Sequence, residues 1–348
     1  MKINDDMYAC AIIGGGVAGL SLAIQLADKG IQTILFEKNT YPFHKVCGEY
    51  ISMESWNFLL SLGLPLNDMN LPSIKKLGIS SEKGFMLNAP LTLGGFGISR
   101  YALDQKLFIL AKSKGVVILE NCKVLNVTNE NADTSTITTT LGMFNAQIVC
   151  GSFGKYTPSF AKNSNASSKK NINYIGVKYH IKTDFQNDKI ELHNFQDGYC
   201  GISKIENDLF CLCYLATSDV LKKSGSDIRQ LEENVLYKNS FLKQIFLKSK
   251  FIFEQPCVIS NITFHKKDTY ANGIFLLISF FSRHTNKKHL IQAYQHAWNN
   301  QFNLRIQSGY YLQSLFGKKN TTHLVLKTLD KLPVSTQKII KLTHGTPF

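Results

Sequence analysis

Three glycines between an apolar strand and an apolar helix constrain the fold of this chain more than any other feature. Residues 8–38 spell YACAIIGGGVAGLSLAIQLADKGIQTILFEK, in which Gly14, Gly16 and Gly19 fit the pattern G-x-G-x-x-G. In such a turn the first glycine makes the tight bend, the second lets a pyrophosphate approach the backbone, and the third lets the helix pack closely on the strand. The pattern predicts a strand, a helix and a second strand, over residues 8–13, 17–29 and 33–36.

The residues around the turn predict a bound dinucleotide. The helix would present the free N–H groups of its first turn, at Val17 and Ala18, and the positive end of its dipole to the phosphates. The second strand leads into Glu37 and Lys38, and a carboxylate at position 37 can accept hydrogen bonds from both hydroxyls of an adenosine ribose. Because an acid here disfavours a 2′-phosphate, the residues predict FAD or NAD rather than NADP.

The next loop favours one of these two ligands. Residues 39–52 spell NTYPFHKVCGEYIS, with a proline, a basic residue and then Cys47, Gly48 and Glu49. This segment resembles the FAD-dependent geranylgeranyl reductase family and its relatives among the class A flavin monooxygenases. The resemblance implies FAD and a position for Cys47 and Gly48 beside the flavin ring. It makes Cys47 a candidate catalytic residue, with simple packing as the alternative role of its thiol.

A second block carries the same resemblance. Residues 95–116 spell GFGISRYALDQKLFILAKSKGV, in which Asp104 follows Arg100 by four residues. The arginine of this segment contacts the cofactor in the resembled family; the alternative is a surface salt bridge between Arg100 and Asp104 on the first turn of a helix. That helix is predicted over residues 101–114. The strand predicted after it, over residues 116–128, carries Val124 where the family has its adenine contact.

Two departures from the resembled family fall on the flavin side. Phe153 stands where many flavin monooxygenases have the aspartate of an Asp-Gly pair, which weakens the expectation of a bound nicotinamide and leaves NAD(P)H open as the reductant. After the position of Leu277 the family has a Gly-Asp pair, a loop and a helix. This chain instead continues ISFFSR and enters a helix predicted over residues 288–315. The sequence therefore predicts a deletion at this point that removes part of the flavin cradle.

The order of strand-like and helical segments predicts an α/β fold. A Rossmann-type FAD-binding domain is expected to carry an inserted antiparallel β-sheet as a substrate domain, because short strands and turn residues follow one another in the middle of the chain. The expected strands there are residues 174–183, 189–195, 198–205, 208–216 and 256–264, with a helical stretch over 227–248. The expected divisions are residues 1–162 for the first part of the FAD domain, with inserted strands of its own, 172–264 for the substrate sheet, and 265–348 for the return to the FAD domain and the C-terminal helices.

Composition limits the partners and the compartment. The formal net charge of +14 comes mostly from dispersed lysines, which favour a solvated surface and leave an acidic carrier protein or an anionic membrane surface open as partners. We see no nucleic-acid-binding motif and no metal-ligand spacing among the eight cysteines, so neither nucleic acid nor a metal is expected. Scattered cysteines and the lack of a signal peptide or a long apolar span predict a cytoplasmic protein, with membrane association left open.

Three functions fit these patterns. The first is an FAD-dependent oxidoreductase resembling geranylgeranyl reductases, which would act on a lipophilic unsaturated small molecule such as a prenyl or polyketide-like chain. The second is a degenerate homologue with weak or no flavin binding. The third is a class A flavin monooxygenase, which would need a nicotinamide to reduce its flavin. No hydrolase or metalloenzyme motif supports a function outside this group.

Overall fold

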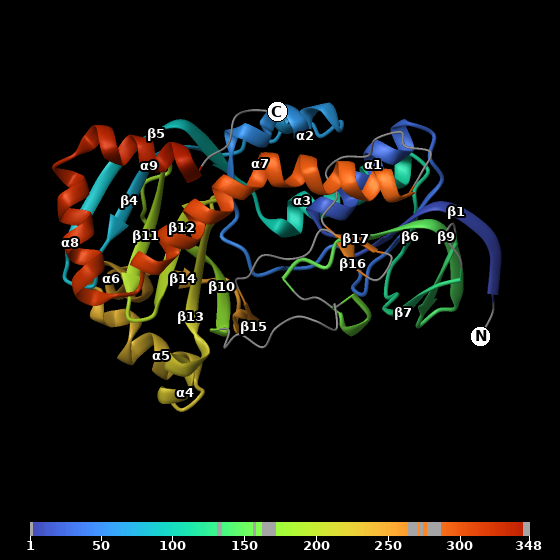
Figure 1. The fold of residues 1–348 in the computed structure, drawn as a ribbon. Helices are drawn as coiled ribbons and strands as arrows, with labels where there is room; N and C mark the ends of the chain where they lie inside the picture. The colour runs from blue at the N-terminus through green and yellow to red at the C-terminus, as the bar shows by residue number, and fades with distance from the viewer. Residues whose placement is uncertain are drawn as a thin grey trace.

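Two β-sheets of different kinds occupy the two ends of the molecule (Figure 1). The computed structural model of the chain describes residues 3–130, 134–155, 158–161, 172–263, 270–271, 274–276 and 287–343. Residues 163–171, which separate the first two expected domains, and the deletion expected after Leu277 lie outside these residues.

The first sheet is built around the strand that precedes the glycine turn. Its strands are β1 (Ile3–Ile13), β2 (Thr33–Phe36), β6 (Val117–Leu119), β7 (Val124–Asn129), β8 (Ser135–Thr139), β9 (Met143–Gly151), β16 (Tyr270–Ala271) and β17 (Ile274–Leu276). β1 lies between β2 and β9 and is parallel to both, while β6 and β17 extend the parallel sheet on either side. β7 and β8 form an antiparallel extension of β9. The parallel order β17-β9-β1-β2-β6 confirms the predicted Rossmann-type arrangement.

Two helices cover one face of this sheet at the positions predicted from sequence. They are α1 (Val17–Asp28) and α3 (Arg100–Ser113). Compared with the predictions, α1 ends one residue earlier, and α3 begins and ends one residue earlier. Apolar residues of both helices share a core with Tyr294 and Trp298, which come from α7 (Lys287–Leu315), close to the end of the chain. The first domain therefore completes its core only with a distant segment of sequence.

The prediction of one continuous strand over residues 116–128 is wrong, because the structure has two strands there, β6 and β7. Asn121 adopts a left-handed backbone with φ 50°, and the N–H of Cys122 donates to the carbonyl oxygen of Glu37 at 2.9 Å. The chain turns at this point, so that β6 remains in the parallel sheet and β7 joins the antiparallel extension.

The second sheet is mostly antiparallel and contains strands from two separate parts of the chain. They are β3 (Tyr50–Ser52), β4 (Ser73–Ser80), β5 (Met86–Gly97), β10 (Tyr174–Lys182), β11 (Lys189–Phe195), β12 (Gly198–Lys204), β13 (Phe210–Thr217), β14 (Lys250–Phe251) and β15 (Cys257–Ile262). Their order is β14-β10-β13-β12-β11-β4-β5-β3, with β15 beside β10. Residues 50–97, expected within the first domain, thus pair with the second sheet through the parallel contact of β4 with β11.

Short helices cover one face of the second sheet. They are α4 (Ser218–Lys223), α5 (Ile228–Asn234) and α6 (Ser240–Lys248), and their apolar residues share a core with β10, β12 and β13. The single helical stretch expected over residues 227–248 is wrong, because a 3-10 turn separates α5 from α6 and the side chain of Asn239 accepts the N–H of Phe241 to start a new helix. The remaining short elements are α2 (Trp56–Ser61), η1 (Met53–Ser55), η2 (Leu66–Asp68), η3 (Ser159–Ala161) and η4 (Leu236–Lys238).

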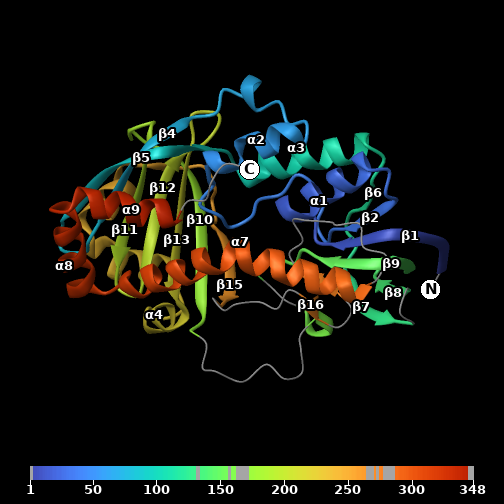
Figure 2. The same cartoon turned by 45° about the horizontal axis from the view of Figure 1, so that its top comes forward.

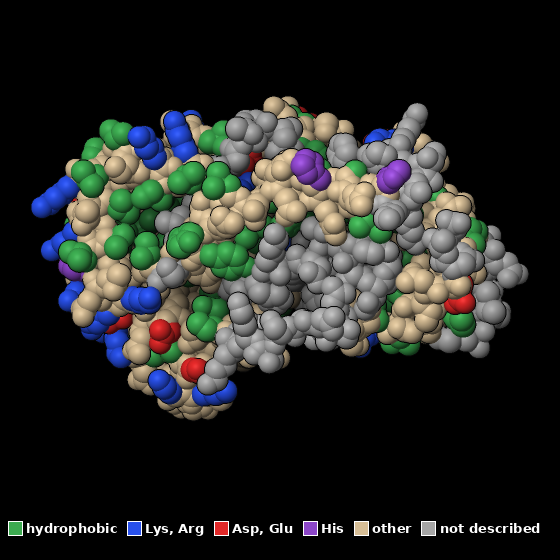
Figure 3. Space-filling model, in the orientation of Figure 1, with side chains coloured by type: hydrophobic (Ala, Val, Ile, Leu, Met, Phe, Trp, Pro, Cys, Tyr) green, Lys and Arg blue, Asp and Glu red, His purple; other side chains and the backbone are tan. Residues whose placement is uncertain are grey.

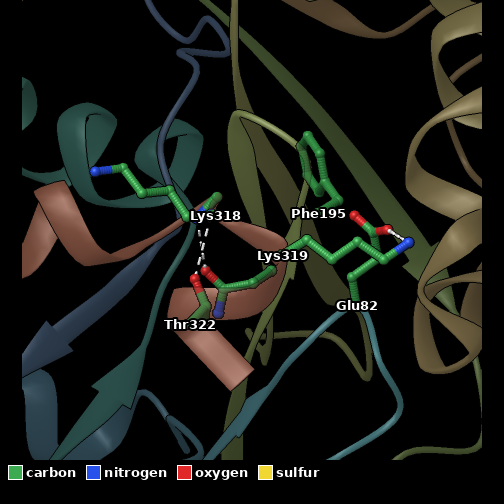
Figure 4. Close-up of a pocket in the computed structure, with 7 residues that line it drawn as sticks. Glu82, Phe195, Lys318, Lys319 and Thr322 are labelled. Atoms are coloured by element: carbon green, nitrogen blue, oxygen red, sulfur yellow. Dashed lines mark hydrogen bonds and ion pairs between the residues drawn. The ribbon is translucent and has the colours of Figure 1, made fainter. Parts of the chain in front are cut away.

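The long helix α7 connects the two ends of the molecule. Figure 2 shows it extending from the first sheet to the second, and Arg305 along its length pairs with Glu54 at 2.6 Å. Figure 4 shows the bend that follows, where Lys319 extends toward Glu82, and their charged groups lie 2.8 Å apart. The helices after the bend are α8 (Lys319–Asp330) and α9 (Pro333–Thr343).

These last two helices lie on the second sheet. Ile340 of α9 packs in a cluster with Ile74, Ala89 and Leu91 from β4 and β5. The range 265–348, expected to hold the return to the FAD domain and the C-terminal helices, is therefore divided between the two sheets. Within the described part of the chain, none of the helices combines the length and the apolar character needed to cross a bilayer.

Candidate functional site

The glycine turn has the close contacts that its sequence predicts. Gly14 adopts φ 106°, and a Cβ atom added to it would lie 2.4 Å from the carbonyl oxygen of Ser152 at the end of β9. A Cβ on Gly19 would lie 2.1 Å from the carbonyl oxygen of Gly14. Any larger residue at either position would collide with backbone, so these two glycines fix the distance between strand and helix.

Gly16 differs from its two partners because no backbone lies against it. A Cβ added there would find only two atoms within 4 Å, Nη2 of Arg100 at 3.5 Å and Nζ of Lys45 at 3.6 Å. Both cations are ion-paired to Asp104, which receives Lys45 Nζ at 2.9 Å and Arg100 Nε at 2.8 Å. The turn is thus open on the side where two basic side chains meet.

This arrangement suits a pyrophosphate. Lys45, Arg100 and Asp104 sum to one positive charge, and the N-terminus of α1, at Val17 and Ala18, adds its dipole. Arg100 pairs with Asp104 and also lies beside the glycine turn, and its contact with the cofactor stays a prediction. Lys45 was not singled out from sequence; its place in a basic loop after the acidic strand was the only available signal.

Glu37 connects the second strand to the glycine turn. Its Oε2 accepts the N–H of Gly15 at 2.9 Å, and its Oε1 accepts both the backbone N–H and the side-chain amide of Asn39. A carboxylate offers about four acceptor positions, so little capacity is left for ribose hydroxyls. The ribose contact stays a prediction, as does a cofactor contact for the exposed Lys38. Val124, the predicted adenine contact, begins β7 and is buried in a core cluster.

Tyr41 holds the loop after β2 against the turn. Its hydroxyl donates to the carbonyl oxygen of Gly15, and its ring stacks on Phe108 of α3 with centroids 4.4 Å apart. Burial, with the nearby charge of Glu37, raises the pKa of Tyr41 far above its usual value, so the phenol keeps its proton as a donor. The loop that carries Lys45 and Cys47 is therefore positioned from both sides.

The end of this loop forms a buried ionic cluster with the second sheet. Oε1 of Glu49 lies 2.7 Å from Nζ of Lys178 and accepts the backbone N–H of Arg100 at 2.9 Å, while its Oε2 lies 2.6 Å from Nε2 of His180. The side chains of Glu49 and Lys178 are 0% exposed. We call Glu49, Lys178 and His180 the interdomain cluster, because β10 of the second sheet contributes the two basic residues.

The protonation of this cluster follows from its contacts. Burial alone would favour the neutral acid, but the hydrogen bond from His180 and the charge of Lys178 together hold the pKa of Glu49 below its ordinary value. Burial, then the charge of Lys178, lowers the pKa of the neighbouring His44 to about 4. At neutral pH Glu49 is therefore ionised and His44 is neutral.

A metal ion does not suit this cluster. Ligand atoms of Glu49, His180 and Cys211 lie within 4.8 Å of one another. However, the carboxylate already holds the ammonium of Lys178, whose charge opposes a cation. Burial raises the pKa of the Cys211 thiol well above its usual value, and this thiol donates to the carbonyl oxygen of Cys47 at 3.3 Å. The cluster therefore has the chemistry of a buried ion pair.

Cys47 and Gly48 lie between the pyrophosphate site and the interdomain cluster. The Cys47 side chain is partly exposed and interacts with the guanidinium of Arg100. A Cβ on Gly48 would meet nothing within 4 Å, and the Gly48 carbonyl accepts Ser203 Oγ from β12. The loop is thus bonded to both domains at the step where the resemblance places the flavin ring. A catalytic role for Cys47 stays a prediction.

The comparisons with known proteins decide between FAD and NAD. Residues 7–83 match the family model of the FAD binding domain. This part of the chain is similar to FAD-binding domains. The cofactor predicted from the glycine turn and the following loop is confirmed as FAD, and the open Gly16 with its two cations fits the pyrophosphate of that cofactor.

Solved structures extend the similarity of fold to nearly the whole chain. The flavin-dependent brominase Bmp2 has a TM-score of 0.78 at 16% identity, covering 99% of this chain and 94% of that chain. A geranylgeranyl bacteriochlorophyll reductase-like protein from Thermoplasma acidophilum has a TM-score of 0.74 at 15% identity, covering 97% and 92%. A flavoprotein/dehydrogenase from Cytophaga hutchinsonii has a TM-score of 0.66 at 14% identity, covering 95% and 100%. Comparison with curated proteins gives no match. The chain has the fold of FAD-dependent oxidoreductases and monooxygenases.

Proposed function

We propose that this protein is an FAD-dependent oxidoreductase of the geranylgeranyl reductase type, acting on a lipophilic unsaturated small molecule such as a prenyl or polyketide-like chain. The observation that carries the proposal is the convergence of Arg100 and Lys45 on the open Gly16. It supports binding of the FAD pyrophosphate at this turn.

Bound FAD would supply hydride-transfer chemistry, and the protein would supply binding, orientation and exclusion of water. Arg100 and Lys45 would neutralise the phosphates, with Asp104 holding both cations in place. The resemblance supports a place for the ring at the loop between the two sheets. NAD(P)H as the electron donor and a cytoplasmic location belong to the same proposal.

The departures from the resembled family favour a second candidate, a degenerate homologue with weak or no flavin binding. The chain has no Gly-Asp pair directly after Leu277, and Phe153 replaces an acid. Phe153 contacts Phe160 edge to face with ring centroids 5.9 Å apart, which is a packing role. The proposed deletion would remove contacts to the ribityl and ring portion while leaving the pyrophosphate site whole.

The visible absorption spectrum of the purified protein, mixed with excess FAD and then desalted, separates these candidates. The oxidoreductase proposal expects retained flavin bands that are weakened in the Gly16→Ala variant, whose added Cβ meets only two flexible cations. Colourless wild-type protein with a normal melting curve would contradict it and favour the degenerate homologue. If flavin is retained, oxygen consumption that depends on an aromatic substrate and NAD(P)H would favour a class A monooxygenase instead.

A further inference from the structure

We propose that the outer faces of α8 and α9 dock on an anionic lipid surface. The proposal names a partner for the proposed function, but it rests on surface residues and does not require bound flavin. Four apolar side chains are exposed on these helices and the turn between them, and two of them, Leu324 and Val334, are 68% and 70% exposed. The other two are Leu332 and Leu342.

Lysines share the outer faces with these apolar side chains. Lys327 of α8 follows Leu324 by three residues, and Lys331, directly after α8, follows it by seven. On α9, Lys338 lies four residues from both Val334 and Leu342. Residues at such spacings lie on one side of a helix. The inner sides are buried at Thr322, Leu326, Thr336 and Ile340. The two helices thus face the second sheet on one side and present a mixture of lysine and leucine on the other.

The charge on this surface is mostly positive. Residues 318–343 contain six lysines and one acidic residue, Asp330. Lys319 is neutralised by Glu82 beneath the bend. Lys327, Lys331, Lys338 and Lys341 have no carboxylate partner in the part of the chain that the structure describes. Figure 3 shows lysine and hydrophobic side chains together at the α8 and α9 end of the molecule.

The composition of the surface favours lipid over an acidic protein. Protein interfaces are enriched in aromatic residues and arginine and depleted in lysine. Residues 318–343 contain no aromatic residue and no arginine. Lysines that contact anionic headgroups, with leucines inserted between them, are instead the pattern of a membrane-surface helix. A lipophilic substrate would dissolve in the lipid bilayer, so docking on the bilayer would bring the protein close to its substrate.

Co-sedimentation of the full-length protein with vesicles tests the proposal. We expect binding to vesicles of phosphatidylglycerol and phosphatidylcholine and none to phosphatidylcholine alone. Lys338→Gln with Lys341→Gln should weaken binding about thirtyfold, from about fivefold for each lysine. Leu324→Ser with Val334→Ser should also weaken it. The matched controls lie on α6, where Lys243→Gln with Lys248→Gln, and Leu247→Ser, should leave binding unchanged.

Three outcomes would overturn the proposal. One is no binding to the anionic vesicles, and another is equal loss in the α6 variants, which would mean attraction by total charge. The third is loss in the lysine variants with none in the Leu324 and Val334 variants, since purely electrostatic binding would suit an acidic protein equally well. Sedimentation measures vesicle binding whether or not the protein retains FAD. Failure of the lipid-docking proposal can therefore be told apart from failure of the proposed function.

Discussion

The pyrophosphate site and the interdomain cluster both combine basic side chains with one carboxylate, but they differ in solvent exposure. At the pyrophosphate site the side chains of Lys45 and Arg100 are 25% and 20% exposed and outnumber Asp104. In the interdomain cluster, Lys178 and Glu49 are 0% exposed and match each other in charge. The pyrophosphate site therefore carries a net positive charge at an open surface, as a binding site for an anion requires. In the interdomain cluster the charge of Glu49 is already neutralised by Lys178, as a structural contact between domains requires.

The largest expected effect comes from breaking the buried pair. Lys178→Met would remove one of the two basic partners of the buried Glu49 carboxyl group. Removal of one member of a buried ion pair costs about 3–5 kcal/mol. We expect a large fall in the melting temperature and in the urea midpoint of the flavin-free protein. Unchanged stability would mean that the cluster does not hold the domains together.

The second prediction concerns pH. The pKa of Glu49 is depressed in the folded protein, so its contribution to stability is fully present above the ordinary glutamate pKa of 4.5 and is lost as the pH falls through the lower folded value. The difference in unfolding free energy between the wild type and Glu49→Gln should therefore be largest near neutral pH and shrink in acid. Urea unfolding at a series of pH values measures it, and a difference that stays constant into acid would contradict the assignment.

The third prediction moves to the pyrophosphate site. Arg100→Ala should weaken FAD binding by about ten- to hundredfold, because hydrogen bonds to charged groups contribute about 1.5–3 kcal/mol. Lys45 would remain to pair with Asp104, so the melting temperature of the flavin-free protein should change little. Fluorescence titration with FAD gives the dissociation constant. A loss of stability without a loss of affinity would show that Arg100 is only the partner of Asp104.

The fourth prediction separates two glycines of one turn. Gly19→Ala should destabilise the protein by about 1–3 kcal/mol, because its new Cβ collides with the backbone of Gly14. Gly16→Ala should leave stability unchanged and affect only FAD binding, since its nearest neighbours are flexible cations. Thermal melts of the two variants without flavin make the comparison, and equal melting temperatures would contradict it.

The smallest effect is expected at an exposed pair. Lys76 and Asp188 lie 3.0 Å apart with side chains 51% and 39% exposed. Solvent screens such a pair, so Lys76→Met should not measurably change the melting temperature. The contrast with Lys178→Met shows how much of the effect there comes from burial; a comparable fall in both variants would attribute it to loss of lysine charge in general.

The sequence predicted the pyrophosphate site far better than the interdomain cluster. The glycines, α1 and β2 follow one another within about thirty residues, so local spacing was sufficient. Glu49 and Lys178 are 129 residues apart, and their contact depends on how two sheets meet. A signal was present in β10, where Lys178 and His180 alternate with Val177, Tyr179 and Ile181. Alternation gives two faces, but it does not say that the polar face is also buried.

The pairing of residues 50–97 with the second sheet was missed for a similar reason. These strands follow the first βαβ unit directly, and their placement in the second sheet depends on the pairing of β4 with β11, which lies more than a hundred residues later. Similarly, no position was predicted for α8 and α9, which follow α7 along the chain but lie on the second sheet. Proximity in sequence did not predict which of the two sheets these strands and helices join.

The placement of α7 limits when the FAD domain can complete its folding during synthesis. Tyr294 and Trp298 belong to the core around α1 and α3. The ribosome therefore releases the glycine turn long before the side chains that finish its surroundings. At about 5–20 residues per second, the interval is on the order of tens of seconds. Throughout this time the nascent FAD domain exposes an apolar groove, so chaperones that bind such surfaces would find this chain during its translation.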